Sequence, residues 1–548
     1  MTAETDVLAF SAFQRDKARQ EKARQALEGA SADEISAFEQ WKTEQAEASV
    51  AKQRPTPESS AAGGAETTDA ILAERVCERV LSESYCWSAG LGWMRWDGKR
   101  WERSNQQTVT ETVRLYMVDA VSKKLRAPDT DWRKRQELMG LLSKGRLVAL
   151  VELAKGILQV RDDMFDAHPD LLNTPSGVVD LKSGELHPHD RWLYLTHITA
   201  AAYRKGATHP DWDKALTALP SEVADWMQVR TGQSVTGHMT PDDVLLVLKG
   251  SGENAKSTFL ETIRRCIGGG YGTLMSDRVL LADPGSHPTE LMDLRGARLA
   301  VAEELPEDRR LNVKRLKDVV GTPTMKARYM KQDTVEWSST HSILISTNYL
   351  PVVSETDHGT WRRLVLVTFP YKFLKPGQQP SGPHERVGDP GLRQRLMDGK
   401  EQGEAVLAWL VEGARRWYEA KRVMPPHPEV VVSDSLKWRA DSDLILAYWM
   451  DRLEPAANSH VLSSDLLSDF NAWLTAKDHP KWSDKTFGAR FEGHDRTAAH
   501  GVHRKKIRAR DGLSRPESVA ARWDAAPVGT SYRSWIGVRF AVETVPED

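Results

Sequence analysis

The apolar residues of this chain gather in short, uninterrupted runs between polar segments. Residues 244–248 read Val-Leu-Leu-Val-Leu, and similar runs fill the centres of 298–304, 341–348 and 364–369. Runs that do not alternate with polar residues are typical of strands buried on both faces of a parallel sheet. The segment 257–266, after the first run, has helical spacing. This order of strand, helix and further strands predicts an α/β core.

The second half of the chain predicts mainly helices. Residues 401–420 have an amphipathic helical pattern, and the prolines of 425–435 predict a connector. Helices are expected at 441–453, 463–477 and 484–492, and strands near 500–508 and 533–543. Helices followed by a hairpin are the order of a winged-helix module.

Shifts in composition divide the chain into six predicted parts. They are a charged helical arm (1–53), a flexible linker (54–68), an α+β N-terminal accessory domain (69–205), the α/β core (206–375), a loop and helical connector (376–435) and a C-terminal winged-helix-like domain (436–548). The arm is rich in Ala, Glu, Lys, Gln and Arg, whereas the linker is rich in small and turn-forming residues.

Composition limits the function classes. The chain has 548 residues, 28% charged and 40% hydrophobic, and no apolar run approaches the ~18 residues of a membrane span. No signal-peptide core is present, and Cys77, Cys86 and Cys266 lack metal-ligand spacing, so a reducing cytoplasm is expected. A net charge of −2 argues against a globally basic nucleic-acid coat. Any DNA contact must therefore come from local patches.

The loop after the first strand, GSGENAKST, has the features of a phosphate-binding loop. Gly250 and Gly252 let the backbone approach an anion, and the free N–H groups of the following helix would point at it. Lys256 would reach the β- and γ-phosphates and Ser257 would bind Mg²⁺. The expected nucleotide contacts are Gly250, Ser251, Gly252, Glu253, Asn254, Ala255, Lys256, Ser257 and Thr258. The alternative is a chance glycine-rich turn.

One position of the loop departs from the usual pattern GxxxxGKS/T. Ala255 stands where that pattern has its second glycine. Alanine fits without strain only if its φ is negative, because the left-handed region costs an L-residue roughly 1–2 kcal/mol. A slower reaction, rather than a loss of nucleotide binding, is the expected consequence.

Polar side chains end the next two predicted strands. Glu303 and Glu304 would lie at the carboxyl edge of the sheet, beside the phosphates. We assign Glu303 to the metal and Glu304 to the attacking water, and the reverse assignment stays open. Asn348 ends the following strand, and its uncharged amide can hydrogen-bond the γ-phosphate or the water. An ordinary acidic strand end before a solvated loop is the alternative.

Basic residues occur at three further places. Arg362 or Arg363 could complete a neighbouring subunit's site by neutralising charge on the γ-phosphate, and the alternative is a surface ion pair. Lys326, Arg328 and Lys331 surround an aromatic residue in a predicted hairpin, which suits single-stranded DNA. A solvated basic hairpin is the alternative.

The C-terminal part carries its own basic cluster. Arg504, Lys505 and Lys506 lie where the wing of a winged-helix module would be. A basic wing contacts the backbone of duplex DNA, which positions the protein without reading sequence. The alternative is a solvated strand pair.

In their order and spacing these motifs resemble a superfamily 3 helicase of the AAA+ class. More narrowly, the chain resembles the phage and plasmid primase-helicase family, which is related to the poxvirus primase-helicase. The resemblance covers about residues 85–375 and is carried by NTPSGVVDLKSGEL (173–186), VRTGQSVTGHMTPDDVLLVLKGSGENAKST (229–258) and STNYLPVVSETDHGTWRRL (346–364).

The resemblance implies a P-loop AAA+ core, hexameric rings, hydrolysis of ATP with Mg²⁺ between subunits, and movement along single-stranded or forked DNA. It implies that Lys256 and Ser257 bind the nucleotide and metal, that Asn348 is a sensor, and that Arg362 or Arg363 acts in trans. The first 84 residues are too few and too helical for a primase catalytic domain, so a separate primase or polymerase is an expected partner. A phage-encoded chain would work in the cytoplasm of its bacterial host.

Two other functions stay open from the sequence. One is an ATP-dependent initiation protein that remodels an origin without processive unwinding, and the basic C-terminal cluster favours it. The other is a P-loop enzyme that does not act on DNA, such as a small-molecule kinase. The predicted trans arginine and basic hairpin argue against the second.

Overall fold

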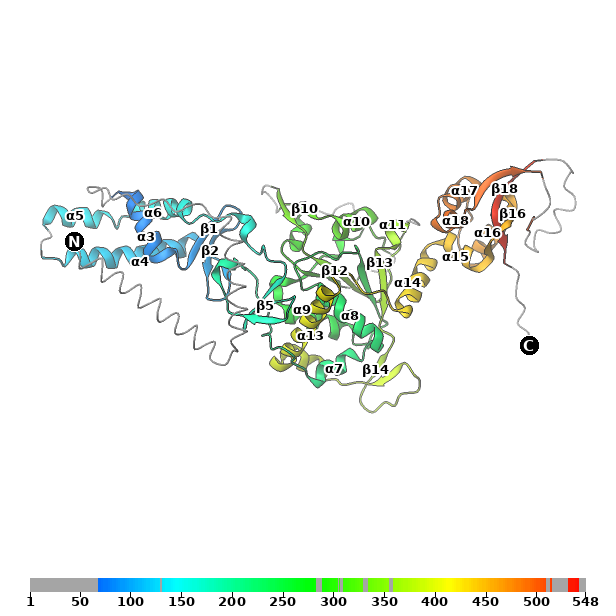
Figure 1. Cartoon of the computed structure of the whole chain (residues 1–548), viewed down its shortest axis with the longest axis horizontal. Helices are drawn as coiled ribbons and strands as arrows, with labels where there is room; N and C mark the ends of the chain where they lie inside the picture. The colour runs from blue at the N-terminus through cyan, green and yellow to red at the C-terminus, as the bar shows by residue number, and fades with distance from the viewer. Residues whose placement is uncertain are drawn as a thin grey trace. The chain divides into compact units, whose positions relative to one another are not determined.

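The computed structural model describes residues 68–128, 131–281, 288–303, 305, 309–328, 334–353, 358–508, 513–514 and 531–541 (Figure 1). The predicted arm, the linker up to residue 67, Glu304 and Lys331 lie outside these ranges. The chain forms two compact units. The first takes the described residues within Met1–Asp97, Glu102–Asp162 and Asp190–Tyr194, and the second takes those within Gly98–Trp101, Asp163–His189 and Leu195–Asp548.

The first unit is mainly helical. Its elements are α3 (Asp69–Val76), the π-helical turn η1 (Cys77–Leu81), β1 (Tyr85–Ser88), β2 (Gly92–Trp96), α4 (Gln106–Leu125), α5 (Trp132–Gly140), α6 (Lys144–Ile157) and η3 (Arg191–Leu193), with β3 (Trp101–Arg103) and η2 (Asp162–Met164) at its borders. Helix α4 buries one stripe with a spacing of four, Val109, Val113, Met117 and Val121. This spacing keeps the stripe on one face of the helix, which packs on α3, α5 and α6.

A five-stranded parallel sheet forms the centre of the second unit. Its order is β13 (Leu364–Thr368), β7 (Leu245–Lys249), β12 (Ser342–Thr347), β9 (Leu299–Glu303) and β8 (Gly272–Leu274). All neighbouring pairs are parallel, so the predicted α/β core is confirmed. The strand β7 comes first in the chain yet lies between β13 and β12, which makes it the point where the strand order reverses.

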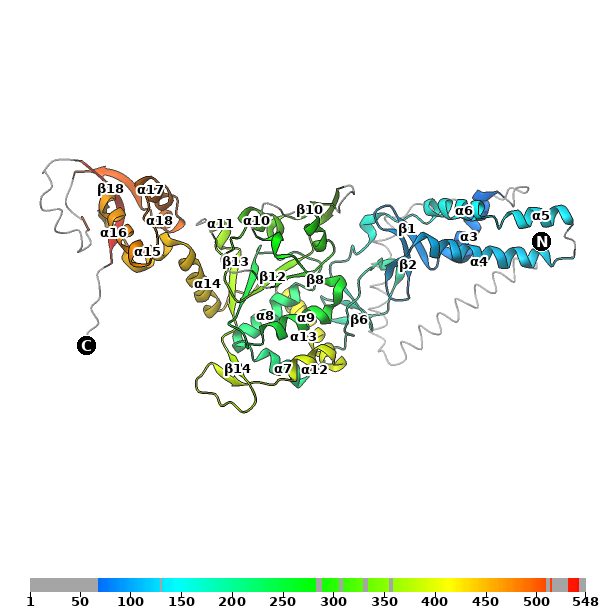
Figure 2. The same cartoon turned by 180° about the vertical axis from the view of Figure 1, so that it is seen from behind.

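Both faces of this sheet are buried, as the uninterrupted apolar runs predicted. Along β7, Leu246 and Leu248 face one hydrophobic cluster, whereas Leu245 and Val247 face another. The helices on the first face are α7 (Pro210–Leu216), α8 (Ser221–Gln233), α9 (Lys256–Tyr271), α12 (Leu392–Asp398) and α13 (Lys400–Glu419). The second face carries η4 (Asp277–Val279), η5 (Pro288–Leu294), α10 (Val313–Gly321) and α11 (His358–Trp361). Figures 1 and 2 show α9 and α10 on opposite sides of the sheet.

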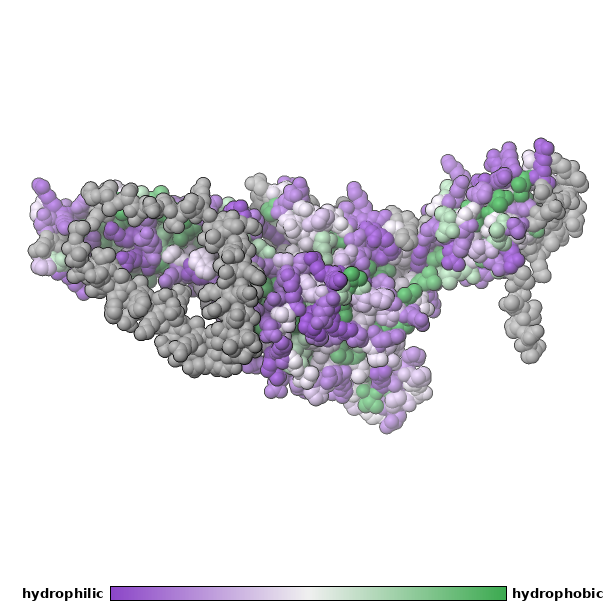
Figure 3. Space-filling model, in the orientation of Figure 1, coloured by the Kyte–Doolittle hydropathy of each residue, from purple (hydrophilic) through white to green (hydrophobic). Residues whose placement is uncertain are grey.

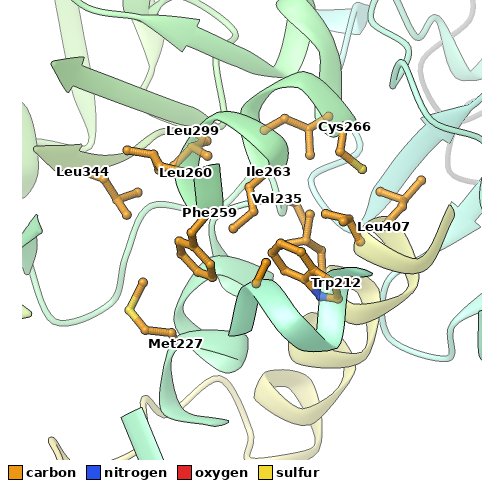
Figure 4. Packing of buried hydrophobic residues seen from close by; sticks show 14 of the residues in the cluster. Trp212, Met227, Val235, Phe259, Leu260, Ile263, Cys266, Leu299, Leu344 and Leu407 are labelled. Carbon is orange, nitrogen blue, oxygen red and sulfur yellow. The ribbon is translucent and has the colours of Figure 1, made fainter. Parts of the chain in front are cut away.

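The first cluster is dense with aromatic rings. Trp212 of α7 stacks on Phe259 of α9 with centroids 5.7 Å apart, and Figure 4 shows both rings beside Ile263. Helices α8 and α13 cross closely, because a Cβ on Gly413 would stand 2.0 Å from the carbonyl oxygen of Gln228. The helix expected at 401–420 is therefore confirmed, but it covers the sheet instead of connecting two domains.

The border of the accessory region differs from the predicted residue 205. The antiparallel sheet β4 (Leu171–Thr174), β5 (Gly177–Asp180) and β6 (Glu185–His187) belongs to the second unit. Arg298, at the start of β9, is buried and donates to the carbonyl oxygens of Leu171 and Val235, both at 2.8 Å. A buried guanidinium that binds two separate segments fastens this sheet to the core.

The last part of the chain has its own hydrophobic cluster. Its elements are α14 (Glu429–Ser442), α15 (Leu444–Arg452), β16 (Leu453–Leu462), α16 (Ser463–Ala476), α17 (Asp484–Glu492), α18 (Asp495–Ala499), β17 (His503–Ile507) and β18 (Tyr532–Phe540), and the antiparallel strand order is β16, β18, β17. The expected helices at 463–477 and 484–492 and both strands are confirmed. Residues 425–435, expected to connect to the last domain, run into α14, and β16 was not predicted from the sequence.

Among the described residues, no helix combines the length and apolar character that crossing a lipid bilayer requires. The space-filling view shows hydrophilic residues over much of the coloured part of the face in view (Figure 3).

Candidate functional site

A loop of unusual backbone geometry joins the first core strand to the next helix. Strand β7 ends at Lys249 and α9 begins at Lys256. Between them, Gly252, Glu253 and Ala255 have positive φ angles of 92°, 50° and 59°. Successive residues in left-handed conformations turn backbone N–H groups toward a common side and make an anion-binding concavity. The loop also lies at the carboxyl end of β7, at the reversal of strand order, where α/β sheets bind their ligands.

The geometry resolves the question raised by Ala255. Its φ of 59° and ψ of 9° lie in the left-handed region, so Ala255 does not have the negative φ that would avoid strain. Its methyl group therefore costs roughly 1–2 kcal/mol that a glycine would not. The usual pattern has glycine at this position, and glycine adopts a left-handed conformation without that cost. The left-handed backbone of Ala255 therefore supports the interpretation of this segment as a phosphate-binding loop.

Gly250 and Asn254 of the loop pack closely against each other. Gly250 has no space for a side chain, because a Cβ there would stand 1.6 Å from Nδ2 of Asn254. That Nδ2 is buried, without a hydrogen-bond partner among the described residues, whereas Oδ1 accepts from the backbone N–H of Lys256 at 3.3 Å. An unsatisfied buried donor is costly unless a ligand accepts from it. Phosphate oxygens are such acceptors, so the residues present fit a bound nucleotide.

The predicted lysine and asparagine meet. Lys256 is 5% exposed, and its Nζ donates to the carbonyl oxygen of Thr347 at 2.5 Å and to Oδ1 of Asn348 at 3.0 Å. The lysine comes from the first turn of α9, and the asparagine follows β12 directly. The arrangement holds a cation and an uncharged amide together at the carboxyl edge of the sheet.

The described acid lies at the same edge. Glu303 ends β9, is exposed, and pairs in register with Ser346 of β12, two residues before Asn348. Ser257 is exposed in the first turn of α9, next to Lys256. A hydroxyl and a carboxylate are ligands that Mg²⁺ accepts together with phosphate oxygens and water. Among the described residues, no group of three His, Cys, Asp or Glu side chains is placed to hold a metal ion.

A cavity of about 290 Å³ adjoins the phosphate loop. Its wall includes Glu253, Ala255, Thr258, Phe373, Leu374, Pro376 and Leu392. The segment that forms its outer side contains the short parallel strands β14 (Lys372–Leu374) and β15 (Glu385–Val387). The backbone N–H of Phe373 donates to the carbonyl oxygen of Glu253 at 2.7 Å, which fastens this segment to the loop. The cavity therefore lies directly beside the loop, and the sequence did not predict it.

The two arginines lie at the other end of the sheet. Arg362 and Arg363 immediately precede β13, whose first residue is in register with the first residue of β7. Both guanidinium groups donate to Oδ2 of Asp243, each at 2.9 Å. The side chain of Arg362 is 42% exposed, whereas that of Arg363 is 15% exposed and also donates to the carbonyl oxygen of Gly359. Neither belongs to the Lys256 cluster within one chain, and Asp243 was not predicted.

The basic hairpin is present. Strands β10 (Thr324–Ala327) and β11 (Val335–Ser338) pair antiparallel. Lys326 forms an exposed ion pair with Glu336 at 2.9 Å, and Arg328 is exposed just after β10.

The basic residues of the C-terminal domain differ in setting. Arg504 is held by Asp484 at 3.2 Å and lies over the ring of Trp535, with 4.8 Å to its centroid. Lys505 and Lys506 are exposed on β17. The two lysines, rather than Arg504, are therefore the ones available to a ligand.

Two segments of the chain match known families. Residues 73–219 match the family described as D5 N terminal like, and residues 248–363 match a family of unknown function (DUF5906). The second segment contains the phosphate loop, Asn348 and both arginines. The apo C-terminal region of NrS-1 resembles the chain with a TM-score of 0.42 and 9% identity, over 86% of this chain and 99% of that one.

Three viral relatives illustrate the sequence similarity. The "Putative primase" of African swine fever virus is 23% identical over 358 residues, which are 60% of this chain and 36% of that protein. The "Putative helicase" of Frog virus 3 is 26% identical over 245 residues, 43% of this chain and 25% of that protein. The "Putative helicase" of Acanthamoeba polyphaga mimivirus is 24% identical, and the match covers 42% of this chain and 25% of that protein. The matches thus span about a third or less of each viral protein. With the D5-type segment, they show that this chain is similar to proteins named putative primases and helicases of large DNA viruses.

Proposed function

We propose that the chain is an ATP-dependent DNA helicase of superfamily 3, with an AAA+ core, that works in the replication of a phage, plasmid or other mobile element. The observation that carries the proposal is the contact between Lys256 and Asn348 beside a loop of left-handed residues. A cation and an amide at the reversal point of a parallel sheet suit a nucleoside triphosphate, because they can neutralise its γ-phosphate and orient an attacking water. The protein would act in the cytoplasm of the host cell.

Each residue at the carboxyl edge has a role in this proposal. Lys256 neutralises the β- and γ-phosphates, and the backbone N–H groups of 250–255 bind their oxygens. Ser257 and Glu303 would hold Mg²⁺, which supplies charge that stabilises the leaving diphosphate. Glu304, which lies outside the described residues, is the proposed base for water, and Asn348 orients that water.

The position of the arginines supports a shared site. They lie at the amino edge of the sheet, whereas Lys256 lies at the carboxyl edge, so one subunit cannot bring both to one phosphate. In a ring, the amino edge of one subunit can face the carboxyl edge of the next. Arg362, the more exposed of the two, is the proposed trans residue, and Arg363 with Asp243 holds the segment in place.

Two surfaces are proposed to contact DNA. The β10–β11 hairpin, with Lys326, Arg328 and Lys331, would bind the backbone of single-stranded DNA. In the C-terminal domain, the order of one helix, one strand, two main helices and two strands is that of a winged helix, and it would present Lys505 and Lys506 to duplex backbone. A separate primase or polymerase is a proposed partner.

The proposal is tested by ATP hydrolysis with and without single-stranded DNA. Hydrolysis by the wild-type protein should increase on adding DNA, and Lys256→Ala should abolish it by removing the charge at the γ-phosphate. Lys400→Ala is the matched control, because Lys400 is exposed at the start of α13, away from the loop. Normal turnover of Lys256→Ala, or hydrolysis that does not respond to DNA, would contradict the proposal.

A further inference from the structure

One end of the helical unit concentrates positive charge. The last turn of α4 carries Lys123 and Lys124, and Arg126 is its C-cap residue. Helix α5 begins with Trp132, followed by Arg133, Lys134 and Arg135. All six cations are exposed. The sequence between residues 123 and 135 holds only two carboxylates against them. We call these six cations and Trp132 the α4–α5 tip.

The tip is not required by the packing of its own unit. The buried stripe of α4 ends at Val121, and Leu138 is the buried residue of α5, so the core stops before the tip on both helices. Like charges this close repel one another and contribute nothing to folding. Asp131 is occupied in capping α5, where it accepts from the backbone N–H of Lys134 at 2.8 Å. Lys123 forms an exposed ion pair with Asp119, one turn earlier on α4, at 2.7 Å.

The tip also exposes a large aromatic ring. Trp132 is 65% exposed, although indole is among the side chains that gain most from burial. Arg133 lies 5.9 Å from its ring centroid, and Met139, two turns along the same face of α5, is 57% exposed. A ring held in water beside cations is a surface that gains from a flat, negatively charged partner.

We propose that the α4–α5 tip binds single-stranded nucleic acid, with Trp132 stacked on an unpaired base and the cations on the neighbouring phosphates. Every base has a π-face that an indole can cover, whereas the paired bases of a duplex do not present theirs. The cations supply the sequence-independent part of the affinity through the backbone. Charge complementarity favours this partner over a second protein surface. The site does not depend on nucleotide hydrolysis. It adds a contact with single-stranded nucleic acid in the first unit, whereas the other proposed DNA-contacting segments belong to the second unit.

The first test measures affinity of the full-length protein for a labelled oligothymidylate by fluorescence anisotropy, without nucleotide and at several salt concentrations. Trp132→Ala should weaken binding about tenfold, whereas Trp132→Phe should retain most of it. The triple variant Arg133→Ala, Lys134→Ala and Arg135→Ala should reduce the slope of log affinity against log salt by about 2, since each strand phosphate contributes about 0.7.

Trp192→Ala is the matched control. Trp192 is 50% exposed in the same unit and lies beside a single arginine, Arg191, at 4.5 Å, without the cluster of cations. Its replacement should leave the affinity unchanged. Equal affinities for Trp132→Ala and the wild type, in a protein whose hydrolysis is intact, would overturn the proposal without affecting the proposed helicase function.

A second test locates the contact directly. An oligonucleotide containing 5-iodouracil should crosslink on irradiation to the peptide that carries Trp132, and single-stranded DNA should compete better than duplex. A crosslink confined to other peptides would overturn the proposal. So would a Trp132→Ala variant that loses self-association at unchanged DNA affinity, because the tip would then be an interface between copies of the chain.

Discussion

Replacing Arg362 tests whether two subunits share one catalytic site. Within one chain, the parallel strands β7 and β13 separate the arginine from the phosphate loop. Strand β7 has five residues, which span about 16 Å, and Arg362 precedes its partner strand while Lys256 follows the loop after β7. An arginine side chain does not bridge that distance, so a catalytic effect of Arg362 has to come from a neighbouring subunit.

The expected loss is large if the arginine acts on the γ-phosphate. Removing such a group lowers the rate about 10³- to 10⁵-fold, equivalent to roughly 4–7 kcal/mol of transition-state stabilisation. Loss of an exposed ion pair to Asp243 alone would change stability by only about 0.2–1 kcal/mol and would leave the rate unchanged. The rate of ATP hydrolysis therefore separates the two interpretations of Arg362.

A mixing assay shows whether the arginine acts in trans. Arg362→Ala has an intact lysine site but no arginine to donate, and Lys256→Ala has the opposite defect. Each is inactive alone, but about a quarter of the interfaces in a randomly mixed ring join the intact halves. The mixture should therefore recover roughly a quarter of wild-type hydrolysis.

The control for this assay is Arg416→Ala. Arg416 forms an ion pair with Asp225 at 2.8 Å and is 34% exposed, a setting similar to that of Arg362, but it lies on α13. Its replacement should leave hydrolysis unchanged. The reasoning fails if Arg362→Ala hydrolyses ATP at the wild-type rate, or if the two defective proteins assemble together without any recovery.

Three further changes test the structure. Ala255→Gly should stabilise the protein by about 0.5–1 kcal/mol, since relief of about 1–2 kcal/mol of backbone strain outweighs the entropy that glycine gains on unfolding. The melting temperature measures this gain. The control Ala420→Gly, at a residue with a negative φ of −74°, should show no rise in melting temperature. Gly413→Ala should destabilise by about 1–3 kcal/mol, because the added methyl group overlaps the backbone of α8, and an unchanged melting temperature would contradict that crossing. Hydrogen bonds from Arg395 lower the pKa of Asp211 to about 2. The stability that they contribute is therefore fully present above the pKa of about 4 in the unfolded chain and is lost as the pH falls toward 2. The difference in melting temperature between wild type and Arg395→Ala should shrink between pH 5 and about pH 2, and a constant difference would refute the linkage.

The sequence predicted the sheet and the glycine-containing loop between β7 and α9 because both have local signals. A strand buried on two faces must be continuously apolar, as β7 is, and a loop that approaches an anion needs glycine at Gly250 and Gly252. Asn348 followed from the same rule, since the residue after a parallel strand lies at the ligand edge. These inferences required no knowledge of how distant segments meet.

The features that the sequence could not predict depend on contacts between residues that are distant in the sequence. Asp243 is 119 residues from Arg362, and nothing in its own neighbourhood indicates the contact. The cavity beside the loop is closed by a breaker-rich segment whose strands, β14 and β15, have three residues each, too few for a periodic signal. The strand β16 contains Pro455 and a run of polar residues with a register shift, which conceal its alternation.

The amphipathic pattern of α13 likewise predicted a helix, but it did not predict that this helix packs against α8. A buried face indicates that a helix packs, whereas Gly413, which lets it approach α8, looks like a weak point in the sequence alone. The predicted border at residue 205 differs from the observed one, because it relied on composition and not on contacts. A domain border in this chain is set by buried residues such as Arg298, which lies in the core and binds a segment 127 residues earlier.

The placement of the site at opposite edges of one sheet also constrains assembly. A contact that satisfies one lysine site uses the amino edge of one subunit and the carboxyl edge of the next, so the first subunit keeps an unused carboxyl edge and the second an unused amino edge. Such head-to-tail contacts continue until a rotation closes them into a ring, or else they form a filament. A strictly monomeric protein that hydrolyses ATP at full speed would leave Arg362 no phosphate to act on. Mass measurement of the wild-type protein with an ATP analogue and DNA therefore tests the shared site independently of any substitution, and a closed oligomer is the expected result.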